Sequence, residues 1–194
     1  MGLNLNIRKK VFGRKIIFDN FNYSFPDTGL FIISGNSGRG KTTLLRIIAG
    51  LDRDFEGTVE GGGISNVSFH FQEYRLFENL TALENITEVS FKEKTQTDKD
   101  SVKTLLKDLG FSDDEAQLYP KQLSGGMKIR VSFARAISKT APILLLDEPT
   151  KELDSNTVTT VERIILEKSK KALVIMVTHD TGLSLFSNAT VINI

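Results

Sequence analysis

The stretch that most constrains this chain is residues 35–42, which read Gly-Asn-Ser-Gly-Arg-Gly-Lys-Thr. It fits the pattern G-x-x-x-x-G-K-[ST] of a phosphate-binding P-loop. The apolar run 30–34 before it predicts a buried strand, and the run 43–49 after it, closed by Gly50, predicts a helix. Strand, glycine loop and helix in this order predict a site for a nucleoside triphosphate, whereas a glycine-rich turn that matched by chance would lack this context.

The chemistry of the loop explains its residue types. Glycines let the backbone turn tightly, so that successive N–H groups form an anion nest at the N-terminus of the helix. Lys41 adds a positive charge for the β- and γ-phosphates, Thr42 offers a hydroxyl to Mg²⁺, and Thr43 offers another near the phosphates. The predicted nucleotide-binding residues of the loop are Gly35, Asn36, Ser37, Gly38, Arg39, Gly40, Lys41, Thr42 and Thr43.

The composition limits the class of protein. The chain has 194 residues, a net charge of +1, 40% hydrophobic residues and no cysteine, so we expect one globular domain without disulfides or a Cys-ligated zinc site. Its charge gives no general attraction to nucleic acid. No apolar run approaches the ~20 residues that span a bilayer, so any membrane role requires a separate partner.

The alternation of strands and helices predicts an α/β fold. Alternating residues 3–7, followed by apolar segments 16–18 and 21–25 joined through Asp19 and Asn20, predict an N-terminal antiparallel sheet. Buried strands at 67–71, 143–148 and 173–178 and an edge strand at 191–194 predict a mainly parallel core. We expect an antiparallel part at about 1–27 and 56–64, a helical part at about 74–140, and a P-loop core in the remainder.

Four polar residues follow predicted parallel strands, at the edge where ligands bind in such sheets. Asp147 would hold Mg²⁺ through water, and Glu148 would orient or deprotonate a water molecule. Gln72 would contact Mg²⁺ or that water, and His179 would donate to the γ-phosphate. Taken singly, each has a structural alternative, such as a helix cap, a surface amide or a strand-end histidine. Their convergence beside a P-loop favours one active site.

Two features near the N-terminus stay open on sequence alone. A basic cluster surrounds the predicted turn at Gly13, and either a solvated hairpin face or a contact to phosphate or a partner would explain it. Phe12 lies in the same turn, where it would be a turn or core aromatic, or would stack on a purine ring. The cluster consists of Arg8, Lys9, Lys10, Arg14 and Lys15.

The segment Leu123-Ser124-Gly125-Gly126-Met127 closely resembles the signature motif of ATP-binding cassette (ABC) ATPases. The order of motifs also resembles that family over essentially the whole chain. Three positions, Met127, Ile129 and Lys151, depart from the common family pattern. The matching motifs are the P-loop, Gln72 as the Q-loop glutamine, the signature, Asp147-Glu148 as Walker B, Asp154 as the D-loop aspartate and His179 as the switch histidine.

The resemblance implies a P-loop NTPase that closes as a dimer around ATP and Mg²⁺. The signature residues Ser124, Gly125 and Gly126 would then face the γ-phosphate bound by the partner subunit. Asp154 would join the nucleotide-binding set, and Phe12 would stack on adenine. The implied catalytic residues are Glu148, His179, Gln72 and Lys41, and the implied metal ligands are Thr42, Gln72 and Asp147.

The resemblance also implies the partners. We expect a second ATPase subunit, identical or different, and transmembrane permease subunits, with the chain at the cytoplasmic inner face of the cell membrane. No nucleic-acid partner is expected. The chain ends soon after His179, from which we expect a minimal cassette, and a separate cassette with a short helical region favours the importer type. The alternatives are a soluble ABC-type ATPase of DNA repair or translation and, behind it, a P-loop kinase or other NTPase, which would leave the signature segment unexplained.

Overall fold

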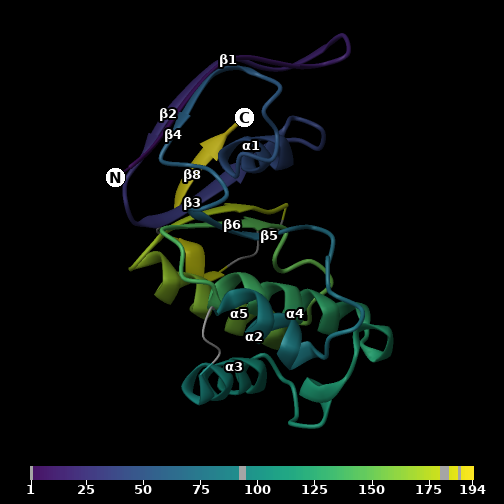
Figure 1. The fold of residues 1–194 in the computed structure, drawn as a ribbon. Helices are drawn as coiled ribbons and strands as arrows, with labels where there is room; N and C mark the ends of the chain where they lie inside the picture. The colour runs from purple at the N-terminus through teal and green to yellow at the C-terminus, as the bar shows by residue number, and fades with distance from the viewer. Residues whose placement is uncertain (1, 92–94, 180–183, 188) are drawn as a thin grey trace.

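The computed structural model describes residues 2–91, 95–179, 184–187 and 189–194, which form two sheets and a set of helices (Figure 1). One sheet is antiparallel with the order β2-β1-β4, and the other has the order β5-β6-β7-β3-β8 with parallel neighbours throughout. The strands are β1 (Leu3–Phe12), β2 (Lys15–Phe25), β3 (Gly29–Ser34), β4 (Glu56–Glu60), β5 (Val67–His70), β6 (Ile143–Asp147), β7 (Leu173–Val177) and β8 (Thr190–Asn193).

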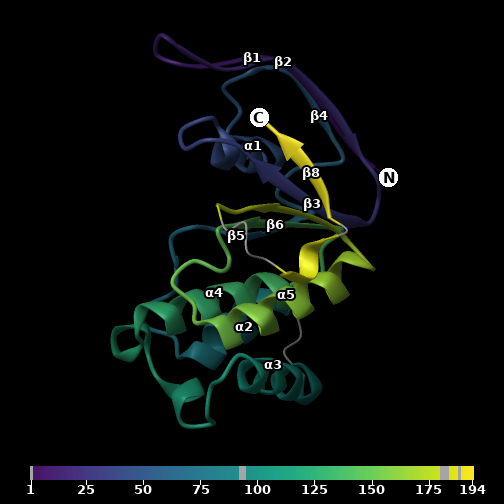
Figure 2. The same cartoon turned by 180° about the vertical axis from the view of Figure 1, so that it is seen from behind.

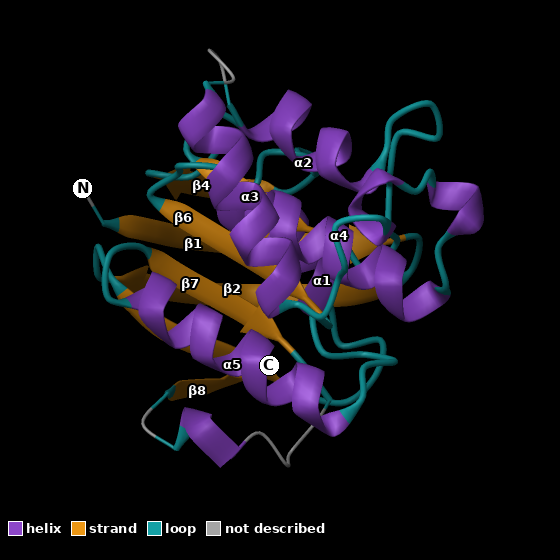
Figure 3. Ribbon diagram, turned by 90° about the horizontal axis from the view of Figure 1, so that it is seen from below, coloured by secondary structure: helices purple, strands orange, loops and turns teal. Residues whose placement is uncertain are grey.

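The helices cover both faces of the parallel sheet. Helix α1 and the antiparallel sheet lie on one face, and α2, α4 and α5 lie on the other, with α3 packed beyond them (Figures 1 and 2). Figure 3 shows this helical layer in front of the strands. The α-helices are α1 (Lys41–Ile48), α2 (Ala82–Ser90), α3 (Gln96–Asp108), α4 (Gly125–Ser138) and α5 (Ser155–Ser169), and the 3₁₀ turns are Glu115–Gln117, Pro120–Gln122 and Ser184–Phe186.

Strand β6 shows how the central strands contribute side chains to two hydrophobic cores. Its side chains alternate, so that Leu144 and Leu146 enter the core under the helical layer. Ile143 and Leu145 enter the core between the sheet, α1 and the antiparallel strands. All of β6 is buried, which explains why its sequence is continuously apolar rather than alternating. The predicted α/β fold with a parallel core and an N-terminal antiparallel sheet is confirmed.

The prediction of two short strands before residue 26 was wrong, because β2 is one strand. It pairs with β1 on both sides of the expected break, as Phe18 opposite Lys10 and Phe21 opposite Ile7. Asn20 has a left-handed φ of 55°, a conformation that asparagine tolerates better than most residues. The turn-forming pair therefore distorts the strand locally without ending it.

Side chains cap the N-termini of several helices. Thr81 and Glu84 form a reciprocal capping box at the start of α2, and Asp154 caps α5. Thr95 and Asp98 form a second capping box at the start of α3, ahead of its first buried residue, Val102. None of the helices in the described ranges combines the length and apolar character needed to cross a membrane.

Candidate functional site

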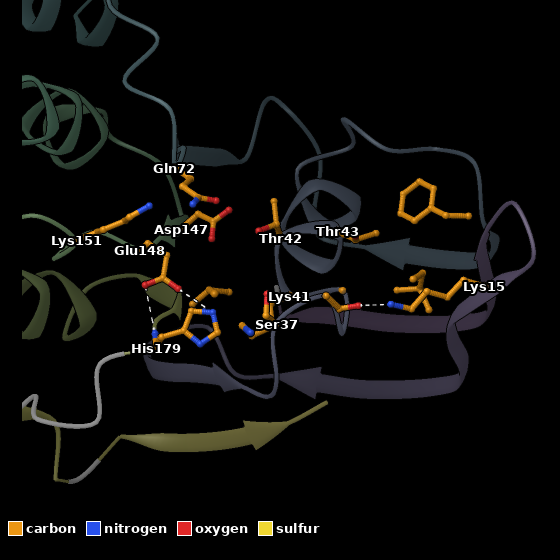
Figure 4. A pocket seen from close by; sticks show the side chains of 15 residues that line it. Lys15, Ser37, Lys41, Thr42, Thr43, Gln72, Asp147, Glu148, Lys151 and His179 are labelled. Atoms are coloured by element: carbon orange, nitrogen blue, oxygen red, sulfur yellow. Dashed lines mark hydrogen bonds and ion pairs between the residues drawn. The ribbon is translucent and has the colours of Figure 1, made fainter. Parts of the chain in front are cut away.

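A cleft of about 610 Å³ lies where the C-terminal ends of β3, β5, β6 and β7 meet (Figure 4). Its volume falls in the range of small-molecule sites. The cleft brings together most of the residues predicted from the sequence, from both sheets and from the P-loop. The lining residues that were predicted from the sequence as site residues are Phe12, Ser37, Gly38, Gly40, Lys41, Thr42, Thr43, Gln72, Asp147, Glu148 and His179. The other three predicted residues of the loop, which do not line the cleft, are Gly35, Asn36 and Arg39.

Close contacts between its backbone and side chains hold the P-loop in place. Gly40 precedes α1 with a φ of 100°, and a Cβ there would lie 2.3 Å from Cγ2 of Ile17, so only glycine fits. Lys41 is 6% exposed, and its Nζ donates to the carbonyl oxygens of Gly35, at 2.7 Å, and Asn36, at 3.1 Å. The ammonium group is thus fixed against the loop whose N–H groups are predicted to bind phosphate.

Asp147 ends β6 and carries a carboxylate with spare coordination capacity. The residue is 2% exposed, and its Oδ1 accepts no hydrogen bond from the described residues. Burial raises the pKa of this carboxyl group, and a hydrogen bond from the side chain of Thr42 opposes that shift. A buried carboxylate oxygen without a partner, beside a threonine hydroxyl, fits a hard divalent cation such as Mg²⁺.

The same surroundings limit how such a cation would be held. In the parts of the chain that the structure describes, no three His, Cys, Asp or Glu side chains gather into a metal cluster. Mg²⁺ at Asp147 would therefore take most of its ligands from phosphate oxygens and water, as it commonly does. Gln72 is exposed and lines the cleft beyond the end of β5, where its amide oxygen could complete the set.

Glu148 and His179 form a pair of polar side chains in the same cleft. Oε2 of Glu148 accepts a hydrogen bond from the backbone N–H of His179 at 3.2 Å, and Oε1 lies 3.5 Å from Nε2 of that histidine (Figure 4). The backbone N–H of Glu148 donates to the carbonyl oxygen of Val177, at 2.9 Å, and its φ of 53° is left-handed. The end of β7 thus holds the start of the loop after β6, in a strained conformation of the kind found at active sites.

The predicted signature residues and Asp154 lie away from this cleft. Ser124 is the N-cap of α4, where its hydroxyl accepts from the backbone N–H of Met127 at 3.3 Å, and Gly125 and Gly126 form the first turn of that helix. Asp154 instead accepts hydrogen bonds from the first backbone N–H groups of α5. None of these residues lines the chain's own cleft, so they could contact only a nucleotide that is bound by another subunit.

The cleft also contains residues that the sequence did not single out as ligands. Nζ of Lys15 donates to the carbonyl oxygen of Gly38 at 2.9 Å, so one member of the basic cluster supports the P-loop. Lys151 lines the wall beside Asp147 (Figure 4), at a position noted only as a departure from the family pattern. Phe12 is 53% exposed and lines the cleft, which excludes the alternative of a core aromatic.

Comparison with known proteins gives consistent matches. A family model described as ABC transporter matches residues 18–151. An aliphatic sulfonates import ATP-binding protein of Bacillus cereus is 39% identical over 206 aligned positions, covering 99% of this chain and 81% of the relative. The protein of the same name from Bacillus subtilis (strain 168) is 37% identical, covering 96% of this chain and 77% of the relative.

Solved structures show the same architecture. The dimeric structure of MJ0796, described as a bacterial ABC transporter cassette, has a TM-score of 0.81 and 29% identity, covering 100% of this chain and 94% of that one. A dimeric post-hydrolysis state of the same cassette, bound to ADP and Pi, has a TM-score of 0.79 and 29% identity, covering 95% and 90%. This chain therefore belongs to the ABC transporter family, as an ATP-binding and ATP-hydrolysing cassette.

Proposed function

We propose that this chain binds MgATP in the cleft at the strand ends and hydrolyses it with the residues assembled there. One observation carries this proposal: the P-loop Lys41, the buried carboxylate of Asp147 and the Glu148–His179 pair all line one cleft. Lys41 and the loop N–H groups bind the β- and γ-phosphates. Asp147, Thr42 and Gln72 hold Mg²⁺, which when bound neutralises charge on the phosphate oxygens.

Glu148 is the group that acts on the attacking water. Its carboxylate lies at the wall of the cleft with 13% of the side chain exposed, and it is oriented by the backbone N–H of His179. A carboxylate held in this way accepts a hydrogen bond from water and withdraws its proton as the water attacks. His179 is 57% exposed, so its imidazole is free to donate to the γ-phosphate when nucleotide is present.

A second subunit completes the site. The signature residues lie at the N-terminus of the 14-residue helix α4, which favours an anion, yet they do not line the chain's own cleft. We therefore infer that Ser124, Gly125 and Gly126 contact the γ-phosphate bound by the partner, and that Asp154 lies at the same interface. The solved relatives are described as dimeric, which supports this arrangement.

The permease partner would dock on a groove of about 330 Å³ on another face. Its apolar lining includes four exposed hydrophobic side chains, Leu51, Ile64, Phe77 and Val89. The charged side chains of the lining are all cationic, so the complementary partner is an apolar cytoplasmic segment of a membrane subunit that carries an acidic residue. The cationic residues are Arg75, Arg135 and Lys139.

We place the chain at the inner face of the cell membrane, as the ATPase of an importer, because the curated relatives are named import ATP-binding proteins. The test is purification of the chain from its own cells with membranes solubilised. Recovery of a polytopic membrane subunit that is lost in Ile64→Asp, while ATP affinity is unchanged, would support the proposal. Recovery of ribosomes or DNA instead would favour the soluble alternative. Exposed Val191 offers a matched control, because Val191→Asp lies outside the groove lining and should not affect recovery.

A further inference from the structure

Lys10 is a buried member of the basic cluster, for which the sequence left open a solvated hairpin face or a contact to phosphate or a partner. It is 1% exposed, although its neighbour Lys9 on the same strand is exposed. Its Nζ donates to Oδ1 of Asp52 at 2.9 Å and to the carbonyl oxygen of Asp54 at 2.6 Å. A buried ammonium group is tolerated only when it is paired in this way, so the contacts are needed to keep Lys10 inside.

A bulge explains how Lys10 turns inward. Leu3, Leu5 and Ile7 alternate toward the core, so strict alternation would point residue 10 toward solvent. The pairing of β1 with β4 shifts between Ile7 and Lys9, and this changes the phase of the strand. Gly57 permits the shift, since a Cβ there would lie 1.9 Å from the carbonyl oxygen of Asn6.

The buried ammonium lies over the ring of Phe12. The distance from Nζ of Lys10 to the centroid of that ring is 4.5 Å, within the range of a cation–π contact. Phe12 itself is half exposed, and it lines both the nucleotide cleft and a neighbouring hollow of about 590 Å³ that includes Asp52 and Asp54. The ring thus stands at the mouth of the cleft with a cation on one face.

We propose that Lys10 is a positioning residue for nucleobase recognition, holding Phe12 against the 52–54 segment so that its free face can stack on the base. The inference rests on the proposed binding of MgATP in this cleft and on the stacking of Phe12 on adenine that the family resemblance implies. The cation–π contact ties the exposed ring to a buried, doubly hydrogen-bonded group. Without that contact the ring would sample other rotamers, and ordering it would cost affinity for the base but not for the phosphates.

The test compares two ligands, ATP and inorganic tripolyphosphate, which share the phosphate contacts but not the base. Lys10→Met keeps most of the length of the side chain and removes the cation. We expect it to weaken ATP binding by about fivefold, the size of one partly exposed cation–π contact, and to leave tripolyphosphate affinity unchanged. Lys9→Met removes the same charge from an exposed position of the strand and should change neither affinity.

A companion variant guards against misfolding. Lys10→Met leaves Asp52 without its buried partner, so Lys10→Met/Asp52→Asn, which removes both charges, is measured alongside. The same base-selective loss is expected in the double variant. Equal weakening of ATP and tripolyphosphate in both variants, or no weakening in the folded double variant, would overturn the assignment.

A double-mutant cycle with Phe12→Ala separates the positioning role of Lys10 from the stacking role of Phe12. If Lys10 acts through the ring, Lys10→Met has no further effect on ATP affinity once Phe12 is alanine. Additive losses would show that Lys10 acts elsewhere and would overturn the inference, while the stacking role of Phe12 would survive. Equal loss of ATP and tripolyphosphate in Phe12→Ala alone would instead refute the stacking role and the inference with it.

Discussion

The carboxylate of Glu148 is held at both oxygens by His179, at 3.2 Å from its backbone nitrogen and 3.5 Å from Nε2 of its ring. These residues follow β6 and β7, which are neighbours in the sheet. The parallel register therefore brings them together although 31 positions separate them along the chain. This relation links the proposed base directly to the residue proposed to contact the γ-phosphate.

Replacing Glu148 with glutamine should abolish steady-state ATP hydrolysis and leave ATP binding intact. Glutamine keeps the shape and can still accept the hydrogen bond from the backbone N–H of His179, but it cannot take a proton from water. We expect a loss of about 100-fold or more in kcat, measured by phosphate release, with ATP affinity within about twofold of wild type. Hydrolysis at the wild-type rate would show that another group is the base.

The same variant should accumulate an ATP-bound dimer. Size-exclusion chromatography with ATP should show a dimer for Glu148→Gln, and addition of Ser124→Arg should abolish it, because a bulky cation at the N-cap of α4 would block the proposed cross-subunit contact. The matched control is Ser101→Arg, at an exposed position of α3. A dimer that forms equally well with Ser124→Arg would contradict the proposed interface.

Asp147→Asn should make nucleotide affinity less dependent on Mg²⁺. The carboxylate is buried, and its Oδ1 has no hydrogen-bond partner among the described residues, so the amide removes the charge that would attract the cation. Affinity for ATP measured with Mg²⁺ should fall by at least about tenfold, as for other losses of metal-site residues. Affinity measured in excess chelator should change little. Equal losses in both conditions would mean that Asp147 acts on the fold rather than on the metal.

The central site was predictable because its signals are local and its geometry follows from topology. The P-loop pattern fixes a strand, loop and helix, and the ends of parallel strands must meet at one edge. Gln72, Asp147 and His179 could therefore be placed in one cleft from the order of strands alone. The structure adds what the sequence cannot supply, such as the pairing of Glu148 with His179 and the absence of Asp154 from the lining.

The contacts that were missed depend on irregular backbone or distant partners. The inward turn of Lys10 follows from a bulge in the pairing of β1 with β4. Gly57, which permits this bulge, lies far along the chain from Lys10. The single strand β2 depends on Asn20 keeping a left-handed conformation within a ladder. In both cases the pairing with another strand overrides the side-chain pattern of one segment. The periodicity of that segment alone cannot reveal this pairing.

The hydrogen bonds of Asn85 predict that this residue stabilises the fold. It is fully buried, and it accepts from the backbone N–H of Phe77 at 2.8 Å and donates to the carbonyl oxygens of Phe77, Leu80 and Thr81 at 3.0, 2.9 and 3.0 Å. Asn85→Leu would remove these hydrogen bonds and leave the N–H of Phe77 and the carbonyl oxygen of Leu80 without this partner, whereas the carbonyl oxygens of Phe77 and Thr81 would each keep a backbone hydrogen bond. We expect the free energy of unfolding to fall by about 2–4 kcal/mol, measured by urea denaturation. Asn22→Leu, at an exposed position, should cost far less.

His70 should make the fold sensitive to acid. The imidazole is 2% exposed, its Nδ1 lies 3.3 Å from the hydroxyl of Ser132, and burial, with a smaller contribution from Arg135, lowers its pKa to about 4. The folded state thus disfavours the charged form relative to the unfolded state, whose pKa is 6.5. The stability that the neutral ring provides is complete above pH 6.5 and is lost as the pH falls from there to about 4.

Over that range His70 should contribute a loss of about 3 kcal/mol in the free energy of unfolding. His70→Val suits a buried strand position and removes the titrating group, so the pH dependence between 6.5 and 4 should become shallower than in wild type, whatever the variant's stability at neutral pH. The measurement is urea unfolding at several pH values for both proteins. The comparison cancels contributions from the titrating groups that both proteins share, such as the carboxyl groups of Glu115 and Asp154, whose pKa values are lowered by hydrogen bonds from Ser112 and Thr157. Parallel pH profiles for wild type and His70→Val would show that His70 does not destabilise the fold in acid.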